Sequence, residues 1–279
     1  MRPLMVAVPT AVKSILERAY LDHHSAFHRE RDPVSLVHSY ATPRDREIAA
    51  VYAALLAYGN VATILSSVRH ILTWLGASPY RSLTERRFDD RILNFRHRFT
   101  TGLDVFILSH WLSSALRSHG SVEAFFNESG APNRDMATRI SAFVERLTEQ
   151  TLPPELTALR DGRSRSLKYL VPSPVRGSAC KRLNLFLRWM VRAEDAIDLG
   201  IWRRVDTRDL MLPVDTHLLK TLRSLRWTRS KQATWRVVES ATARLRTLCP
   251  EDPIRYDFSL CHLSMSGGNL RAYRELSGA

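Results

Sequence analysis

The sequence predicts an all-α fold. Apolar residues recur at helical spacing through most of the 279 residues, and capping or breaking residues stand where such segments start and stop. No segment alternates β-branched and polar residues over a sustained length, and no solenoid period is found. We therefore expect a helical protein without a substantial sheet.

The expected helices follow one another along the chain. Residues 46–59 are rich in Ala, follow the candidate caps Thr42 and Asp45, and stop at Gly59. The other expected helices span residues 61–75, 103–120, 121–128, 137–151, 154–160, 179–192, 214–225, 231–249 and 256–265. The basic segment 160–166 and the mixed segment 192–213 are expected to be loops.

Positive charge is the most unusual property of the composition. The formal net charge is +13, which favours nucleic acid, an acidic membrane surface or an acidic protein as the partner. Between Arg160 and Arg192 there are nine basic residues and one acidic residue, Asp161, so this segment carries nine minus one, or +8. A solvated charged face is the ordinary explanation, but the cations flank a turn and an apolar helix, which favours contact with backbone phosphates.

Several classes of protein are disfavoured. The three cysteines include no C-x-x-C pair, which argues against a disulfide framework, a zinc site and a four-cysteine iron–sulfur cluster. No apolar run is long enough to span a membrane. The start of the chain has a short apolar stretch like that of a signal peptide, but Pro9 interrupts it and Lys13 follows. We expect a cytoplasmic, nucleoid-associated protein without a cofactor or bound metal.

One helix is expected to start in an unusual way. Apolar residues at spacings of three and four from Leu183 to Met190 mark one helical face. Gly177 and Ser178 stand where a turn and a cap are expected, so the helix should begin near Ala179 or the Cys after it.

Lys181 and Arg182 then fall in the first turn of this helix, where the dipole and the unpaired backbone N–H groups favour anions. Two explanations fit this arrangement. An anion such as phosphate binds at the helix start, or the positive surroundings favour the neutral, nucleophilic form of the lysine amine.

A carboxylate opens a later helix. The segment Pro213–Val214 leads to Asp215, and Leu218, Leu219 and Leu222 begin another amphipathic helix after it. An Asp at this position is sufficiently explained as an N-cap. A lysine in the first turn of one helix, combined with V-D-T-H at the start of a later helix, is a more specific signal of function than either motif alone.

These two motifs carry a resemblance. G-S-A-C-K-R-L-N-L-F-L followed by P-V-D-T-H-L-L-K resembles the helix-hairpin-helix DNA glycosylases of the endonuclease III superfamily. Lys181, Asn184 and Leu187 match the K-x-x-N-x-x-L pattern. The long interval of 215 − 181 = 34 residues and the single hairpin glycine look more like the archaeal 8-oxoguanine glycosylase branch. A bacterial family of unassigned function is similar over about residues 32–265.

The resemblance implies roles for particular residues. Lys181 would attack the sugar C1′, and Asp215 would stabilise the developing positive charge and assist proton transfers. A hairpin around Arg176, Gly177 and Ser178 would bind a DNA phosphate, with Arg182 and Lys168 as further DNA contacts. This chemistry is physically coherent, because a glycosidic bond to a base breaks with oxocarbenium character that a carboxylate stabilises.

A damaged base must leave the helical stack before it can be excised. The resemblance points to Tyr58 and Asn60, at the end of an early helix, and to Asp257, at the start of the last helix, as residues of the base pocket. Each has a simpler explanation: packing at a helix end for Tyr58 and an N-cap for Asp257.

We thus expect two interlocked helical lobes with a helix-hairpin-helix element and a DNA-binding cleft between them. Residues 45–200 would form one lobe, and residues 1–44 with 201–279 the other. The expected function is removal of a damaged base, 8-oxoguanine or another oxidised purine, from double-stranded DNA by a monomeric glycosylase with β-elimination (AP lyase) as a second step. A non-catalytic DNA-binding protein on the same fold is the alternative, and RNA binding is a third hypothesis.

Overall fold

The computed structural model describes residues 8, 10–129, 134–162 and 164–265, and its elements are almost all helical. The all-α class is confirmed. The exception is a small antiparallel hairpin of β1 (Arg96–His97) and β2 (Thr100–Thr101). Strands of two residues are too short to show the alternation by which a sequence reveals a sheet. Among the described helices, none has the length and apolar character of a membrane span.

The chain divides into two compact units at positions that differ from those expected. One unit comprises Glu30–Arg176, and the other comprises the described parts of Met1–Arg29 and Gly177–Ala279. The division falls at a turn, since Gly177 has a left-handed φ of 76°, and it precedes the expected lobe boundary at residue 200. Lys181 and Asp215 therefore belong to the same unit. We call the two parts the middle unit and the terminal unit.

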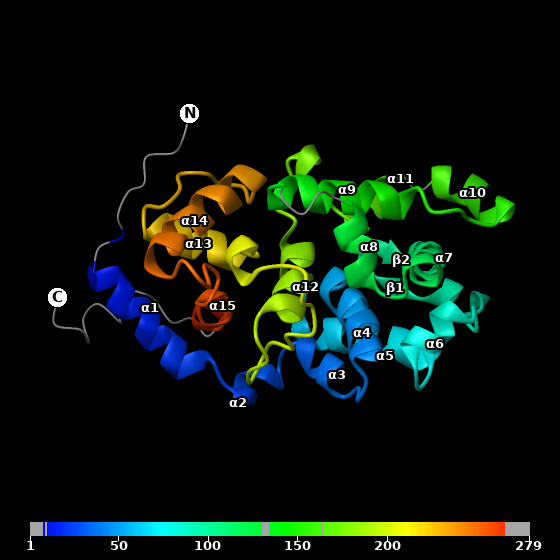
Figure 1. The fold of residues 1–279 in the computed structure, drawn as a ribbon, viewed down its shortest axis with the longest axis horizontal. Helices are drawn as coiled ribbons and strands as arrows, with labels where there is room; N and C mark the ends of the chain where they lie inside the picture. Colours follow the sequence, from blue (N-terminus) through cyan, green and yellow to red (C-terminus); the bar gives the residue numbers. More distant parts are fainter. Residues whose placement is uncertain (1–7, 9, 130–133, 163, 266–279) are drawn as a thin grey trace. The chain divides into compact units, whose positions relative to one another are not determined.

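The middle unit is a helical bundle. Helix α7 packs against α6, α8, α9 and the 3₁₀ helix η1, and α4 packs against α3, α5 and α6 (Figure 1). Its helical elements are α3 (Val34–His38), α4 (Pro43–Leu55), α5 (Val61–Leu75), α6 (Pro79–Thr84), η1 (Asp90–Asn94), α7 (Gly102–His119), α8 (Val122–Ser129), α9 (Met136–Thr148), α10 (Pro154–Asp161), α11 (Ser164–Leu170) and η2 (Pro174–Arg176).

Several of these helices begin and end at the expected signals. Thr42 is the N-cap of α4, and its side chain accepts a hydrogen bond from the backbone N–H of Asp45. Helix α7 ends at Gly120, which adopts the left-handed conformation at φ 77° that glycine tolerates best. Helix α4 stops at Leu55, before the expected end at Gly59.

The expected loop at residues 160–166 is wrong in part, because α11 begins inside it at Ser164. Helix α11 shows little apolar periodicity in its first turn, where Arg165 is exposed, and it is held by the buried side chains of Leu167 and Leu170. Tertiary packing of these two residues outweighs the polar composition that suggested a loop.

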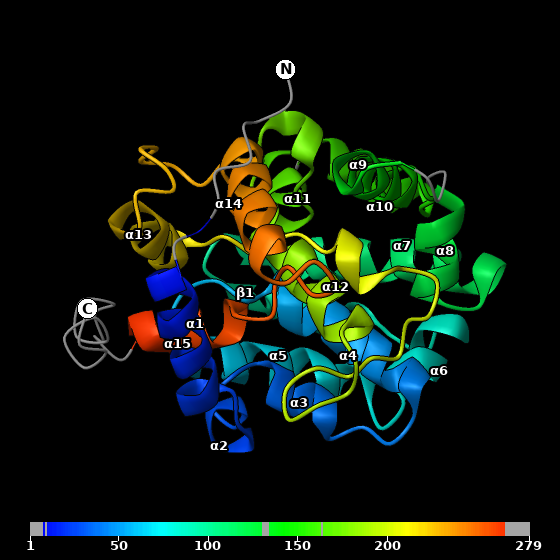
Figure 2. The same ribbon diagram turned by 60° about the vertical axis from the view of Figure 1, so that its left-hand side comes forward.

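The terminal unit joins the first helix of the chain to the last. Helix α15 packs against α1 and α13, and these elements lie side by side in Figure 2. The helical elements of this unit are α1 (Thr10–His23), α2 (Ala26–Arg29), α12 (Lys181–Val191), η3 (Thr207–Asp209), α13 (Thr216–Ser224), α14 (Trp235–Leu248) and α15 (Asp257–Met265).

The segment between α12 and α13 is irregular, as expected, but closely attached to the unit. The backbone N–H groups of Leu199 and Trp202 donate hydrogen bonds of 2.8 Å to the carbonyls of Trp189 and Met190 near the end of α12. Trp189 and Met190 are fully buried. The segment thus covers one end of α12 and satisfies backbone groups that the helix cannot satisfy itself.

Candidate active site

The start of α12 is shaped by two residues in left-handed backbone conformations. Gly177 has φ 76°, and Cys180, the N-cap of α12, has φ 47° and ψ 35°. The prediction that Ser178 caps the helix is wrong, because its hydroxyl accepts a 3.2 Å hydrogen bond from the N–H of Cys180 before the helix begins. Lys181 is the first residue of α12 and Arg182 the second, so both lie in the first turn as predicted.

This turn is fixed to the rest of the terminal unit by backbone and side-chain contacts. The carbonyl of Gly177 accepts a hydrogen bond of 3.3 Å from the N–H of Trp235, and Ser178 forms an isolated β-bridge with Thr234. Within α12, the side chain of Asn184 donates a buried 3.1 Å hydrogen bond to the carbonyl of Ala179. The position of Lys181 is therefore set by contacts on both sides of the helix start.

Asp215 is placed by a buried extended segment. Leu212 and Val214 are buried, and the N–H of Leu212 donates a 3.0 Å hydrogen bond to the hydroxyl of Thr242 on α14. The Oδ1 atom of Asp215 accepts a 2.8 Å hydrogen bond from the N–H of Leu218. The N-cap role expected for Asp215 is thus confirmed.

The second oxygen of the same carboxylate faces Lys181. Asp215 Oδ2 lies 4.0 Å from Lys181 Nζ, and the two side chains are 21% and 27% exposed, respectively. At this separation the two groups attract as an ion pair without a direct hydrogen bond. The structure brings together an amine and a carboxylate that are both open to solvent, next to the N-terminus of α12.

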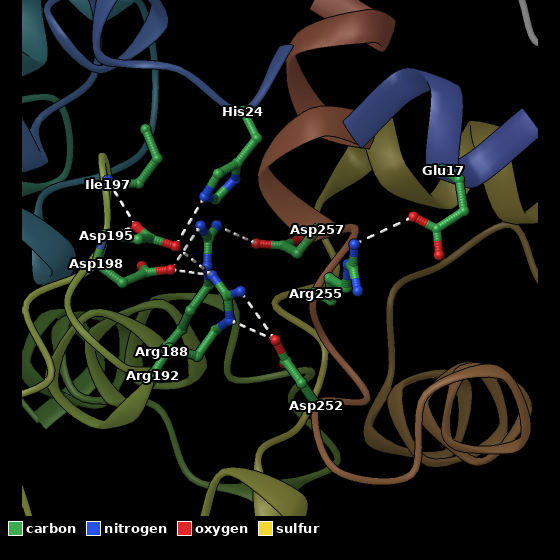
Figure 3. Close-up of polar contacts among 10 residues, drawn as sticks. All are labelled: Glu17, His24, Arg188, Arg192, Asp195, Ile197, Asp198, Asp252, Arg255 and Asp257. Carbon is green, nitrogen blue, oxygen red and sulfur yellow. Dashed lines mark hydrogen bonds and ion pairs between the residues drawn. The ribbon is translucent and has the colours of Figure 1, made fainter. Parts of the chain in front are cut away.

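A network of buried charges in the terminal unit holds α12 in place (Figure 3). Arg188 is 1% exposed, and its guanidinium contacts Asp257 at 2.8 Å and Asp198 at 3.1 Å. Burial lowers the pKa of Arg188, but the two carboxylates outweigh it, and the pKa lies above its ordinary value. Arg188 is therefore a fixed positive charge that joins α12, the irregular segment and α15.

Arg192 extends the network by one helical turn (Figure 3). It pairs with Asp198, with Asp252 at 2.8 Å and with Asp195 at 3.5 Å. Asp195 accepts a 2.8 Å hydrogen bond from His24. Burial acts to raise the pKa of Asp195, but hydrogen bonds from His24 and two backbone N–H groups together hold it well below its usual value. The residue His24, near the end of α1, is thus tied to the segment that follows α12.

Asp257 connects the network electrostatically to the lysine–carboxylate pair. The expected N-cap role of Asp257 is wrong: it is the first residue of α15, and its carboxylate bonds to Arg188 instead. Burial raises the pKa of Asp257 to about 6, although Arg188 acts in the opposite direction; nearby Asp215 also raises it and Lys181 lowers it. Asp257 is 4% exposed, so direct contact with a base would require movement of the residues that cover it.

The raised pKa of Asp257 predicts a pH dependence of stability. The folded chain binds the carboxyl proton of Asp257 more tightly than the unfolded chain does. Protonated Asp257 therefore makes its full contribution to the free energy of unfolding below about pH 4, and this contribution is lost as the pH rises to about 6. Over that interval we expect the free energy of unfolding of the wild-type protein to fall, relative to Asp257→Asn, by about 1–3 kcal/mol. Urea titrations of both proteins from pH 4 to 7 measure this difference, and parallel profiles would contradict the assignment.

The remaining predicted DNA contacts do not share one environment. Arg182 is only 8% exposed, whereas Arg176 and Lys168 are exposed side chains. Not all of the basic residues between Arg160 and Arg192 are open to phosphate contact, because Arg188 and Arg192 are also buried and are matched by carboxylates. Arg176 and Lys168 belong to the middle unit, and Gly177, Ser178 and Arg182 to the terminal unit.

The residues predicted for an early base-pocket loop also lie in the middle unit. The Tyr58 hydroxyl is hydrogen-bonded to the carbonyl of His97 at 3.0 Å and to the hydroxyl of Thr100 at 2.7 Å. Asn60 is the N-cap of α5, and its side chain accepts a 2.9 Å hydrogen bond from the N–H of Ala62. Both side chains thus have local structural roles.

The residues that sequence reasoning missed are Arg188, Arg192 and Asp198. A signal for them was present, since two arginines one helical turn apart precede Asp195 and Asp198, and charges of opposite sign at such short spacing favour pairing. Among the side chains that the structure describes, no group of three or more His, Cys, Asp or Glu residues is arranged to hold a metal ion.

Comparison with known families gives one match. The model of the family described as "Protein of unknown function (DUF2400)" matches residues 32–266, and the chain belongs to this family. No curated protein and no solved structure matches the chain. The match extends across both compact units and includes Lys181, Asp215 and Asp257.

Proposed function

We propose that the protein is a DNA glycosylase that removes a damaged base through Lys181. The observation that carries the proposal is the 4.0 Å separation of Lys181 Nζ from Asp215 Oδ2, in partly exposed side chains from two different helix starts. The two motifs that resemble those of helix-hairpin-helix glycosylases favour a catalytic role for this pair, because a purely structural ion pair would not need them. The chain order of α11, the turn through Gly177 and α12 also suits a helix-hairpin-helix element.

The chemistry needs a neutral amine that attacks and a carboxylate that is charged while the bond to the base breaks. Lys181 Nζ forms a bond to the sugar C1′ while the C1′–N bond to the base breaks, and the base leaves with the bonding electrons and takes up a proton. Asp215 stabilises the positive charge that develops on the sugar and accepts the proton that the amine loses. Ring opening then gives a Schiff base, from which β-elimination nicks the strand.

The partner in this proposal is double-stranded DNA that carries an oxidised purine, with 8-oxoguanine as the first candidate. Arg176 and Lys168 are exposed cations suited to phosphate contacts. The DNA-binding cleft between interlocked lobes, the base-pocket roles of Tyr58, Asn60 and Asp257, the monomeric state and the nucleoid location stay predictions of the same hypothesis.

Borohydride trapping tests this proposal. The wild-type chain is incubated with a duplex that carries one 8-oxoguanine, with undamaged and abasic duplexes as controls, and the Schiff base is reduced to a stable covalent adduct. We expect an adduct with the 8-oxoguanine duplex and none with the undamaged duplex. An adduct with the abasic duplex alone would support the lysine chemistry and direct the search to other lesions.

The alternative of a non-catalytic DNA-binding protein makes a different prediction in the same assay. Such a protein would bind the duplexes, yet it would give no adduct and release no base from any lesion in a panel of oxidised, alkylated and deaminated bases. That result would reject the glycosylase hypothesis. Competition among duplex DNA, single-stranded DNA and RNA identifies the preferred polymer.

A further inference from the structure

The middle unit contains a pocket whose lining includes neither Lys181 nor Asp215. Its volume is about 250 Å³, and residues from α7, α9, α10, α11 and η2 line it. Trp111, Leu167 and Val171 contribute apolar surface, and Thr148 contributes a hydroxyl. We refer to it as the α11 pocket. It is somewhat smaller than pockets for drug-sized ligands, which limits an occupant to roughly one nucleotide.

The charged residues of the α11 pocket favour an anion. Arg160, Lys168 and Arg176 line it together with a single carboxylate, that of Asp161. Asp161 accepts hydrogen bonds from Arg160 at 2.8 and 3.0 Å, so these two charges largely offset each other. Lys168 and Arg176 remain as the cations that a ligand would meet.

The two cations are available to a ligand. Arg176 donates a 3.0 Å hydrogen bond to the carbonyl of Val171, which orients the guanidinium while further N–H donors remain. Lys168 is exposed, and its ammonium makes no hydrogen bond or ion pair within the described part of the chain. The oriented Arg176 and the exposed Lys168 lie beside apolar side chains. This combination suits a phosphate ester whose organic part packs against those side chains.

Trp111 provides a second observation. It is 1% exposed, it lines the pocket, and its indole N–H is buried without a hydrogen-bond partner among the described residues. Buried donors in native structures nearly always have an acceptor, and an unpaired donor therefore calls for an explanation. The indole nitrogen itself is buried, so an acceptor on a bound ligand reaches it only if the side chains that cover it move aside.

We propose that the α11 pocket binds a nucleoside monophosphate group, with the phosphate between Lys168 and Arg176 and the base or sugar against Trp111, Leu167 and Val171. The group belongs either to a free nucleotide or to the 5′-phosphorylated end of a DNA strand. The site uses neither Lys181 nor Asp215, but it shares Lys168 and Arg176 with the DNA phosphate contacts proposed above, and the pocket residues all lie in the middle unit.

Isothermal titration calorimetry of the full chain tests the pocket. Deoxyadenosine 5′-monophosphate is the probe, and deoxyadenosine and inorganic phosphate are the partial ligands. We expect a Kd of roughly 10–1000 µM for the nucleotide, at least tenfold weaker binding of either partial ligand, and about tenfold weaker nucleotide binding by Lys168→Gln. If a 5′-phosphorylated oligonucleotide competes with the nucleotide better than its unphosphorylated form does, the natural ligand is a DNA end. If neither oligonucleotide competes, the natural ligand is the free nucleotide.

Two variants serve as controls. Arg165→Gln removes an exposed cation from the same helix that does not line the pocket, and Lys181→Gln removes the proposed nucleophile. Both should bind the nucleotide as the wild type does. The proposal is overturned if the nucleotide does not bind at 10 mM (about tenfold above the weakest expected Kd), if inorganic phosphate or deoxyadenosine binds as tightly, or if Lys168→Gln and Arg165→Gln have the same effect.

Discussion

Lys181→Gln is expected to abolish the covalent adduct with DNA and to slow base release by about 10³-fold or more. Glutamine has no nucleophilic amine, so the bond to C1′ cannot form. DNA affinity should change little, because one cation is lost from a chain whose formal net charge is +13. Trapping and single-turnover base release measure the chemistry, and fluorescence anisotropy with the same duplex measures binding.

The control for this variant is Lys220→Gln, which removes an exposed lysine from α13 and should leave the trapped adduct unchanged. Asp215→Asn complements it, since asparagine retains an oxygen that caps α13 while the negative charge beside Lys181 is lost. That variant should fold normally and release base far more slowly. Full base release by Lys181→Gln would disprove the assignment of the nucleophile.

The second large effect is expected at Arg188. In Arg188→Met the carboxylates of Asp198 and Asp257 lose a buried cation while most of the apolar stem is retained. Removing one partner of a buried ion pair costs about 3–5 kcal/mol because it leaves an uncompensated charge. Urea denaturation at pH 7, followed by circular dichroism, should show a loss of this size.

Two further variants separate charge from packing. Arg236→Met changes an exposed arginine on α14 and should alter stability by less than about 0.5 kcal/mol. Arg188→Met combined with Asp257→Asn removes one of the stranded charges and should recover part of the loss. If the double variant were no more stable than Arg188→Met, the loss would have to come from packing.

The sequence was most informative about helices with strong local signals. Helix α5 spans the expected residues 61–75, because its apolar periodicity and its neighbouring Asn60 and Gly76 act locally. Helix α11 was missed because its stability depends on the burial of Leu167 and Leu170 by residues far away in the chain. The division between the units falls earlier than expected, and the pairs of Arg188 with Asp198 and Asp257, which tie α12 to the rest of the terminal unit, are not part of the apolar pattern that predicts helices.

The candidate site could be predicted to the level of its two principal residues. Lys181 and Asp215 stand at helix starts with recognisable sequence signals, and the fold brings Lys181 Nζ to 4.0 Å from Asp215 Oδ2. Burial was the property that sequence reasoning could not assign. Arg182 and Arg188 look like surface cations in the sequence, but both are buried. The local charge pattern hints at Asp198 as a partner of Arg188, but no local pattern specifies Asp257, which is 69 residues away.

The attachment of α1 to α15 has a consequence for synthesis on the ribosome. The hydroxyl of Tyr256 donates a 2.6 Å hydrogen bond to Glu17 across a separation of 239 residues. The middle unit is continuous in sequence and is free to fold as it emerges, whereas α1 must wait for α15, a delay of roughly 10–50 s at ordinary rates of translation. Lys181 and Asp215 therefore acquire their full surroundings among the last steps of folding, so a nascent chain exposes its cations before the lysine–carboxylate pair is complete.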